Sequence, residues 1–183
     1  MLSGTMMAST SLSVADDNCG DAVERNALKV AHERRELERA IAYWERKVIR
    51  RGPASTLMSL DTAEMTNEEW AYRFIIAVDS IVENCVPLFY GSKFAALLDL
   101  PAKPDPRVPM VQQLPARFVP VFTKGCREAT ALGAPVRLQG AVEREDGRRE
   151  FYRAVFIAVG VRPDCLTHLA FGAFNCRVRA GAM

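Results

Sequence analysis

Residues 151–161, FYRAVFIAVGV, are apolar at nearly every position and follow a charged turn centred on Asp146-Gly147. On a β-strand, side chains alternate between the two faces, so the even-numbered residues 152–158 would lie opposite the odd-numbered residues 155–161. An antiparallel sheet with one wet face alternates apolar and polar residues, and this strand does not. We therefore predict that both faces of the sheet are covered. The candidate covers for the second face are the N-terminal helix, its dimer mate and another protein.

The neighbouring segments complete the predicted sheet. Strands are expected over 135–144, 150–161 and 166–178, joined by the Asp146-Gly147 hairpin turn and by the turn at 162–165. Two earlier strands are expected over 70–79 and 86–91. Between these two groups we expect a small helix capped by Ser92, a proline-rich loop over 101–109, and a longer helix over 115–132 that ends at Gly133. These helices can cover one face of the sheet, so the cover of the other face must come from outside residues 70–178.

The N-terminal third reads as one long helix. Residues 1–20 resemble a disordered lead-in, and from 21 to 51 the chain holds no Gly or Pro before Gly52-Pro53 stops the helix. The expected organisation is a lead-in over 1–20, a dimerisation helix over 21–52, a linker over 53–69, a domain over 70–178 and a tail over 179–183. The apolar positions form a narrow seam typical of helix pairing. Its candidate interface residues are Val30, Leu37, Ile41, Trp44 and Val48. The alternative is that this helix folds back onto its own domain.

Net charge and cysteine spacing limit the kinds of partner and site that the chain is expected to have. The chain of 183 residues has a net charge of only +2, so no strong field favours nucleic acid or an anionic membrane. A DNA-associated regulator that uses Arg46, Lys47, Arg50 and Arg51 is a minor alternative. The five cysteines are widely spaced without a C-x-x-C pair, which favours reduced thiols over a metal or redox site. No signal peptide or membrane-spanning stretch is recognised, so the protein is expected in the cytoplasm.

Two motifs resemble the PAS domain family. The segment 133–158, GAPVRLQGAVEREDGRREFYRAVFIA, resembles the family's strand–turn–strand in Gly133, Pro135-Val136 and the residues 144–147. The segment LFYGSKFAALLDLP resembles the family's stretch between second strand and first helix, although Gly91 and Asp99 replace its usual Asn and Gly. The segment QQLPARFVPVF resembles a divergent, alphaproteobacterial PAS subgroup. The resemblance covers residues 70–178 and implies an α+β fold: a PAS-like antiparallel sheet with small helices on one face, preceded here by the long helix.

The resemblance also implies a ligand space between sheet and helices, which holds haem, flavin or a metabolite in many members. The weak candidate pocket residues are Phe118, Phe122, Cys126, Phe156, His168 and Phe171. No specific motif supports haem or flavin. Asn175-Cys176-Arg177 resembles part of the flavin-adduct motif but lies in a predicted strand rather than at the start of a helix. We assign neither a cofactor nor a metal site.

The function expected from these features is a stand-alone sensory or regulatory module that acts through a protein partner as a homodimer. No phosphate loop, G-x-S-x-G or H-E-x-x-H motif points to an enzyme. The alternative is a small-molecule binding protein or an enzyme with an α+β pocket.

Overall fold

The computed structural model describes residues 27–28, 31–32, 34–46, 67–160 and 168–178. The chain divides into two compact units, Met1–His32 and Glu33–Met183. In the first unit, residues 27–28 and 31–32 are helical. The second unit contains a helix over residues 34–46 and the whole sheet. The expected lead-in, most of the linker, the turn at 162–165, the tail, Val30 and Val48 lie outside the described residues.

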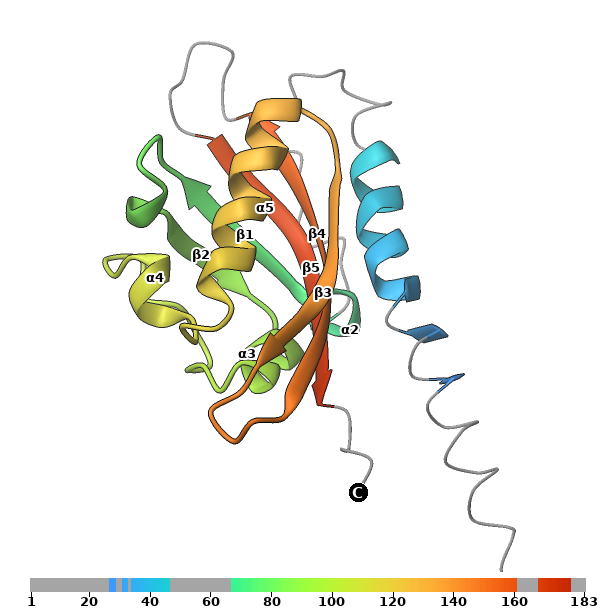
Figure 1. Cartoon of the computed structure of the whole chain (residues 1–183). Helices are drawn as coiled ribbons and strands as arrows, with labels where there is room; N and C mark the ends of the chain where they lie inside the picture. Colours follow the sequence, from blue (N-terminus) through green and yellow to red (C-terminus); the bar gives the residue numbers. More distant parts are fainter. Residues whose placement is uncertain (1–26, 29–30, 33, 47–66, 161–167, 179–183) are drawn as a thin grey trace, which may run out of the picture. The chain divides into compact units, whose positions relative to one another are not determined.

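The sheet is antiparallel and five-stranded in the described part of the chain, in the order β2-β1-β5-β4-β3 (Figure 1). The strands are β1 (Arg73–Val78), β2 (Val86–Tyr90), β3 (Val136–Glu143), β4 (Arg149–Gly160) and β5 (His168–Val178). Consecutive pairing of β3, β4 and β5 confirms the predicted meander. The early hairpin of β1 and β2 joins it through β1 and β5. The fold class is α+β and PAS-like, as the sequence predicts.

Short helices and one longer helix connect β2 to β3. They are α3 (Ser92–Leu97), α4 (Met110–Gln113) and α5 (Val119–Leu132), and α2 (Asn67–Trp70) with the 3₁₀ turn η3 (Val82–Asn84) flank the first two strands. Figure 1 shows α5 lying across one face of the sheet. Phe94 of α3, Met110 of α4 and Phe122 of α5 all enter one buried cluster with that face. These helices therefore form a single covering layer.

Several boundaries differ from the sequence predictions for local reasons. Trp70 ends α2, so β1 begins at Arg73 rather than at residue 70. Gly91 occupies the N-cap position of α3 and no side chain caps the helix, so Ser92 is the first helical residue and not the cap. The longer helix begins at Val119, with Pro120 in its first turn, where a proline removes no helical hydrogen bond.

Two glycine turns end their elements as predicted. Gly133 terminates α5 in the left-handed conformation at φ 61°, and its N–H donates to the carbonyl of Ala129 over 2.9 Å. Gly147 has φ 75° in the β3–β4 hairpin. The hairpin register runs from Val136 opposite Phe156 to Glu143 opposite Arg149. Glycine suits both positions because a side chain would strain a positive φ.

The buried residues form two clusters, one on each face of the sheet. The cluster on the inner face, beneath α3, α4 and α5, contains Ala154 and Phe156 of β4. The cluster on the outer face contains Val155, Ile157 and Val159 of the same strand, packed with residues of the helix over 34–46. This alternation confirms that the sheet is covered on both faces, and it identifies the N-terminal helix of the same chain as the second cover.

Candidate functional site

The space between sheet and helices, where the resemblance places a ligand, is occupied by phenylalanine rings. The cluster comprises Phe74, Phe94, Phe118, Phe122, Phe156 and Phe174, each no more than 1% exposed. Phe122 is at its centre, with ring centroids 5.2 Å from Phe74, 5.4 Å from Phe156 and 5.3 Å from Phe174. These separations are those of rings in direct contact. A ligand on this face would have to displace the rings.

Two glycines allow this packing. A Cβ added to Gly125 of α5 would lie 2.3 Å from the ring of Phe156. A Cβ added to Gly172 of β5 would lie 2.1 Å from the carbonyl oxygen of Val155 and 2.4 Å from the ring of Phe74. Glycine at these positions brings α5 onto β4 and the ring of Phe74 onto β5. The cluster is therefore packed more closely than a side chain at either glycine would permit.

The six candidate pocket residues do not share one site. Phe118, Phe122, Cys126 and Phe156 are fully buried together in the inner cluster. Phe171 belongs to the outer cluster, on the opposite face of the sheet. His168 is the first residue of β5, half-buried, and pairs with Val78 and Gly160. The sequence pattern could have separated Phe171 from Phe174, because odd-numbered and even-numbered residues of β5 face opposite sides.

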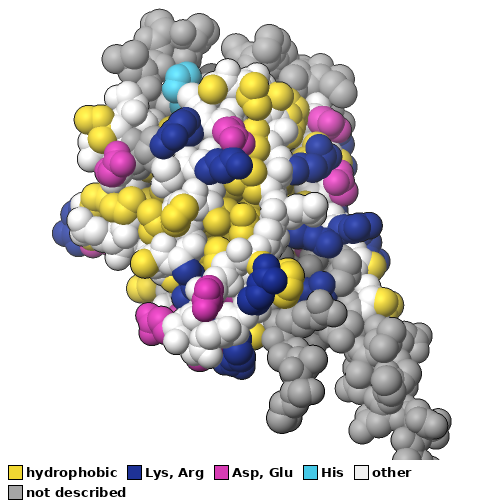
Figure 2. Space-filling view, in the orientation of Figure 1, with side chains coloured by type: hydrophobic (Ala, Val, Ile, Leu, Met, Phe, Trp, Pro, Cys, Tyr) yellow, Lys and Arg dark blue, Asp and Glu magenta, His cyan; other side chains and the backbone are white. Residues whose placement is uncertain are grey.

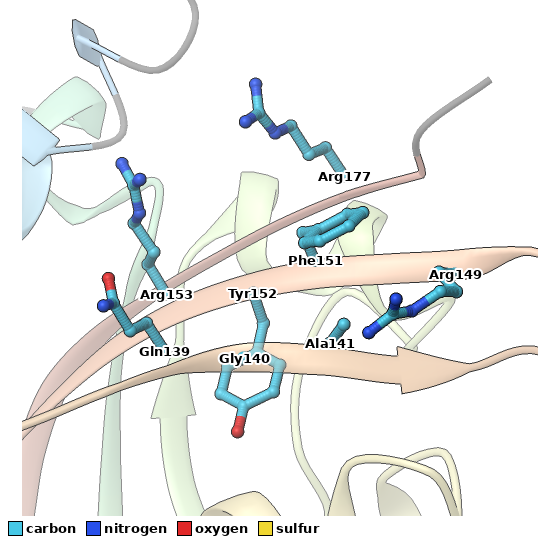
Figure 3. A pocket seen from close by; sticks show the side chains of 8 residues that line it. All are labelled: Gln139, Gly140, Ala141, Arg149, Phe151, Tyr152, Arg153 and Arg177. Atoms are coloured by element: carbon cyan, nitrogen blue, oxygen red, sulfur yellow. The ribbon is translucent and has the colours of Figure 1, made fainter. Parts of the chain in front are cut away.

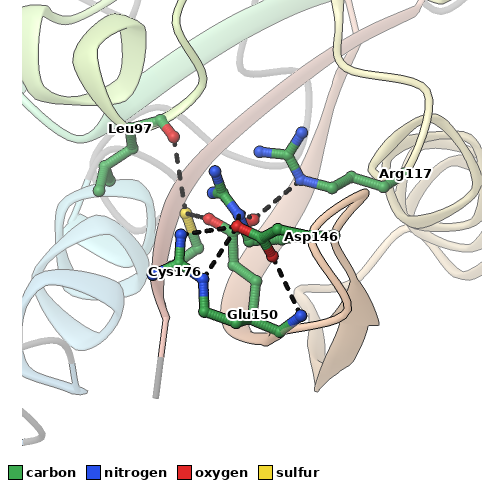
Figure 4. A network of polar contacts seen from close by, with 7 residues as sticks. Leu97, Arg117, Asp146, Glu150 and Cys176 are labelled. Carbon is green, nitrogen blue, oxygen red and sulfur yellow. Dashed lines mark hydrogen bonds and ion pairs between the residues drawn. The ribbon is translucent and has the colours of Figure 1, made fainter. Parts of the chain in front are cut away.

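A buried carboxylate joins three segments at one end of the inner cluster (Figure 4). Glu150 of β4, 3% exposed, accepts hydrogen bonds from Arg117 Nε at 2.8 Å and from Arg144 Nη1 at 3.4 Å. The Cys176 thiol lies 3.3 Å from Glu150 Oε1 and 3.9 Å from the carbonyl oxygen of Leu97. The network connects Arg117, in the loop before α5, and Arg144, in the β3–β4 hairpin, to the end of the sheet. The charge of Glu150 is thus compensated by two arginines, which favours a structural role.

The described thiols are poor nucleophiles. Cys85, Cys126 and Cys176 are free and buried. Burial raises the pKa of the Cys126 thiol, and the nearby Cys85 raises it further. Burial also raises the pKa of Cys176, aided by the charge of Glu150. The thiolate is the reactive form of cysteine. Because these thiols are buried and have raised pKa values, they are expected to stay protonated and to react slowly. Cys19 and Cys165 lie outside the described residues.

The helix over residues 34–46 is held on the outer face by apolar and polar contacts. Leu37 and Ile41 are 7% and 4% exposed and pack with Val155, Phe171 and other outer-face residues. Of the seam predicted for pairing between copies, Leu37 and Ile41 thus lie against the chain's own sheet, as in the alternative interpretation. Trp44 is only partly buried against the same cluster. At the β3 side, Arg137 Nη2 lies 3.2 Å from Glu38 Oε2.

A buried arginine lies beneath this helix. Arg73 of β1 is 2% exposed, and its guanidinium carbon lies 5.6 Å from the ring centroid of Tyr43 and 5.9 Å from that of Phe171. Burial lowers the pKa of Arg73, while the charges of Glu69 and Glu36 oppose this effect. The hydrophobic pattern of β1 gave no signal for this contact, because arginine in a strand is ordinarily taken as exposed.

Beyond the helix, the outer face is hollowed and rich in arginine (Figure 3). One hollow of about 350 Å³ is formed by β3, β4 and the end of β5. It is lined by Gln139, Gly140, Ala141, Arg149, Phe151, Tyr152, Arg153 and Arg177. A second hollow, of about 460 Å³, lies between the helix over 34–46 and β3. It is lined by Arg34, Leu37, Glu38, Arg137, Leu138, Gln139 and Arg153. The hollows share Gln139 and Arg153, and together we name them the arginine groove.

In the ranges that the structure describes, no three or more His, Cys, Asp or Glu side chains gather in a way that could hold a metal ion. Over the same ranges, no helix has both the length and the apolar character needed to cross a membrane.

Comparisons with known proteins add little to this description. No protein-family model matches the chain, and no curated protein matches it. Among solved structures, the chain is similar to a fungal LOV domain photoreceptor, which is described as revealing an evolutionarily conserved pathway that integrates blue light and oxidative stress. The sequences are 14% identical, and the match covers 57% of this chain and 76% of that chain with a TM-score of 0.37.

Proposed function

We propose that this protein is a PAS-type sensory or regulatory module that acts through contacts with other proteins, and that it is not an enzyme. The observation that carries this proposal is the contrast between the two faces of the sheet. The inner face is filled by six phenylalanine rings in mutual contact. The outer face carries a docked helix next to a polar, accessible groove. Binding is therefore expected on the outer face.

The helix over residues 34–46 is the element proposed to carry the signal. Its contact with the sheet combines the apolar side chains of Leu37 and Ile41 with the charged pair of Glu38 and Arg137. The arginine groove runs beside it and includes Arg34, Leu37 and Glu38 of the helix itself. A partner in the groove would contact helix and sheet together. It would shift the position of the helix only if it bound the docked and displaced arrangements with different affinity.

We also propose that the protein is a homodimer, as the PAS resemblance implies. Because Leu37 and Ile41 are buried on their own sheet, the two copies would meet through the exposed side of this helix or by exchanging it. The exposed side presents Arg35, Arg39, Glu45 and Arg46. Charges of both signs are available there for pairing between two copies.

An absorption spectrum and a denaturing mass spectrum of the purified full chain test the main proposal. We expect no absorption above the aromatic band and no released small molecule. In parallel, the tagged chain would be used to isolate proteins from its native cells, with the Leu37→Asp, Ile41→Asp double variant as the comparison. A partner retained by the unaltered chain and lost from the variant supports the proposal. A coloured preparation, or no partner under either condition, contradicts it.

The second candidate function is the binding of a small molecule in the core, as a carrier or an enzyme. One observation favours it: the buried hydroxyl of Tyr90, which lies in the inner cluster, has no hydrogen-bond partner in the described part of the chain. A buried hydroxyl without a partner is costly, by about 1–3 kcal/mol, and a ligand could satisfy it. Release of a stoichiometric compound on denaturation would establish this candidate instead.

A further inference from the structure

The two edges of the sheet differ in how well they are protected against pairing with another strand. The sheet ends in β2 on one side and in β3 on the other. Proteins commonly block an exposed edge with a proline or a bulge. In β2, Pro87 has no N–H to donate, and the pairing with β1 shifts register between Ile75 and Ile76. In contrast, β3 has eight residues, no proline and an unbroken register with β4, so it is the edge that can accept a further strand.

The backbone of β3 shows which groups would bond to that further strand. In an antiparallel sheet, the N–H and C=O groups of successive residues point to alternate neighbours. The N–H of Arg144 donates to the carbonyl of Arg148 over 2.9 Å, so Arg144 and the even-numbered residues of β3 face β4. The odd-numbered residues direct their backbone groups to the outer edge, and they are Arg137, Gln139, Ala141 and Glu143. Within the described ranges, no strand pairs with this edge.

The charges of β3 are complementary to those of a second, antiparallel β3. When two copies pair about Gly140, Arg137 of each copy lies opposite Glu143 of the other. Odd-numbered residues then face odd-numbered residues, so the outward backbone groups of both strands meet. Arg137 and Glu143 are both exposed in the single chain. Arg137 also contacts Glu38 at 3.2 Å, and its five donors allow it to contact both carboxylates.

The inner side of β3 is complementary in the same register. Leu138 and Val142 are only partly buried against the inner cluster, and each would lie opposite the other residue in the second copy. Gly140 would lie at the centre, beneath no side chain of its own. A Cβ added there would lie 2.9 Å from the Tyr152 hydroxyl, and Figure 3 shows the Tyr152 ring on this side of the strand. The central glycine thus leaves space for a Tyr152 ring from each copy.

The helices over residues 34–46 would lie on one face of the joined sheets. A two-fold axis through Gly140, perpendicular to the sheet, keeps the outer faces of both copies on the same side. The helix packs on that outer face, and its Glu38 contacts Arg137. One helix would therefore lie on each side of the junction. Because Arg137 would contact both the helix and the second copy, the position of the helix would be coupled to the association of the copies.

We propose that two copies of this chain pair antiparallel through β3, centred on Gly140, so that their two sheets join into one. The inference rests on the proposed homodimer and specifies where its copies meet. A second copy is favoured over a strand of another protein because β3 is complementary to itself. It carries a basic residue, Arg137, near its start and an acidic residue, Glu143, at its end.

The test uses two single variants of the full chain, Arg137→Glu and Glu143→Arg. Each variant alone places like charges opposite each other at both ends of the junction, whereas an equal mixture of the two restores opposite charges at both ends. Light scattering over a concentration series measures the dissociation constant of the dimer. We expect each variant alone to raise this constant by about tenfold or more, and the mixture to return it to within about threefold of the unaltered value.

The controls make the same charge changes away from β3. Arg127→Glu on α5 and Glu83→Arg in η3 alter exposed residues and should leave association unchanged. Figure 2 shows basic and acidic side chains interspersed over the α5 side of the molecule, so a single change of charge is expected to be tolerated there. Amide hydrogen exchange needs no variant. In the unaltered dimer, the N–H groups of Gln139 and Ala141 should be protected, and in either β3 variant alone they should exchange rapidly.

The proposal is overturned if the unaltered dimer exchanges the Gln139 and Ala141 amides rapidly, if the β3 variants alone stay dimeric, or if their mixture stays monomeric. If those two amides become protected only when another protein binds, the edge belongs to that protein instead. A monomeric unaltered chain removes the homodimer proposal as well. A dimer that the Leu37→Asp, Ile41→Asp variant loses but both β3 variants keep would leave the homodimer proposal standing and exclude this junction.

Discussion

The guanidinium carbon of Arg73 lies 5.6 Å from the centre of the Tyr43 ring, and this contact joins the first strand of the sheet to the helix over residues 34–46. Both side chains are buried, at 2% and 5% exposure. A cation over an aromatic ring contributes about 2 kcal/mol when both are removed from water. The contact between Arg73 and Tyr43 thus helps to hold the helix on the sheet, and a substitution of Tyr43 tests this.

Replacing Tyr43 with alanine is expected to loosen the helix without unfolding the sheet. The variant loses a buried ring and leaves Arg73 with less shielding from the solvent. Amide hydrogen exchange should become faster in residues 34–46, with β4 and β5 unchanged. Glu45→Ala, on the exposed side of the same helix, is the control and should exchange like the unaltered chain. Equal protection in both variants would show that the helix does not depend on this contact.

The second prediction concerns oligomeric state. Light scattering is expected to give the mass of a dimer for the unaltered chain and of a monomer for the Leu37→Asp, Ile41→Asp variant. The physical reason is that two carboxylates cannot be buried against Val155 and Phe171. The helix therefore leaves the sheet and no longer holds its exposed side in position for the second copy, nor can it dock on the sheet of that copy. Circular dichroism would check that the domain remains folded. A mass that is identical for the two proteins would refute dimerisation through this helix.

The third prediction addresses the aromatic core. Gly125→Ala should lower the free energy of unfolding by about 1–3 kcal/mol, because the new methyl group meets the Phe156 ring at 2.3 Å. In an exposed helix, the same change would stabilise by about 1 kcal/mol. Urea denaturation measures the difference. In a Phe156→Leu background the penalty should shrink, since the ring is gone. A stabilised Gly125→Ala variant would mean that the core has unfilled space.

These cases show which features of the fold can be predicted from sequence. The apolar residues at nearly every position of 151–161 predicted that both faces are covered, because successive side chains of a strand point to opposite faces. The Gly133 and Gly147 turns were predictable because a positive φ favours glycine. The start of α5 was misplaced, since Pro115 and Pro120 are both acceptable near a helix start.

The candidate site was harder to predict than the fold. Phe118, Phe122 and Phe156 were correctly grouped, but sequence could not reveal that their rings meet one another rather than a ligand. That outcome depends on the close approach that Gly125 permits across a long sequence separation. The arginine groove was missed because its arginines are far apart in the sequence: Arg153 and Arg177 belong to separate strands, and Arg34 belongs to the N-terminal helix. Their proximity follows from strand pairing, which no local pattern encodes.

The fourth prediction follows from the buried thiols. Burial raises the pKa of Cys85, Cys126 and Cys176, so at pH 8 each should remain protonated and unreactive toward a disulfide reagent. In a Cys19→Ser, Cys165→Ser variant, we expect no rapid reaction until a denaturant is added, after which three thiols react. A thiol that reacts rapidly in the folded variant would contradict the closed packing of the inner cluster.

The fifth prediction concerns the hairpin in acid. Hydrogen bonds from the Arg148 side chain and backbone N–H, with the charges of Arg148 and Arg144, lower the pKa of Asp146 to about 2 from its ordinary value of 3.8. A lowered folded-state pKa means that the stabilisation is complete above the unfolded value and is lost as pH falls from about 4 towards 2. Asp146→Asn should therefore lose less stability than the unaltered chain over that interval, measured by urea denaturation at each pH. Arg148→Met removes the side-chain donors but keeps the backbone N–H, so it should flatten the profile less than Asp146→Asn does. If both variants follow the unaltered curve, the ion pair does not contribute to acid unfolding.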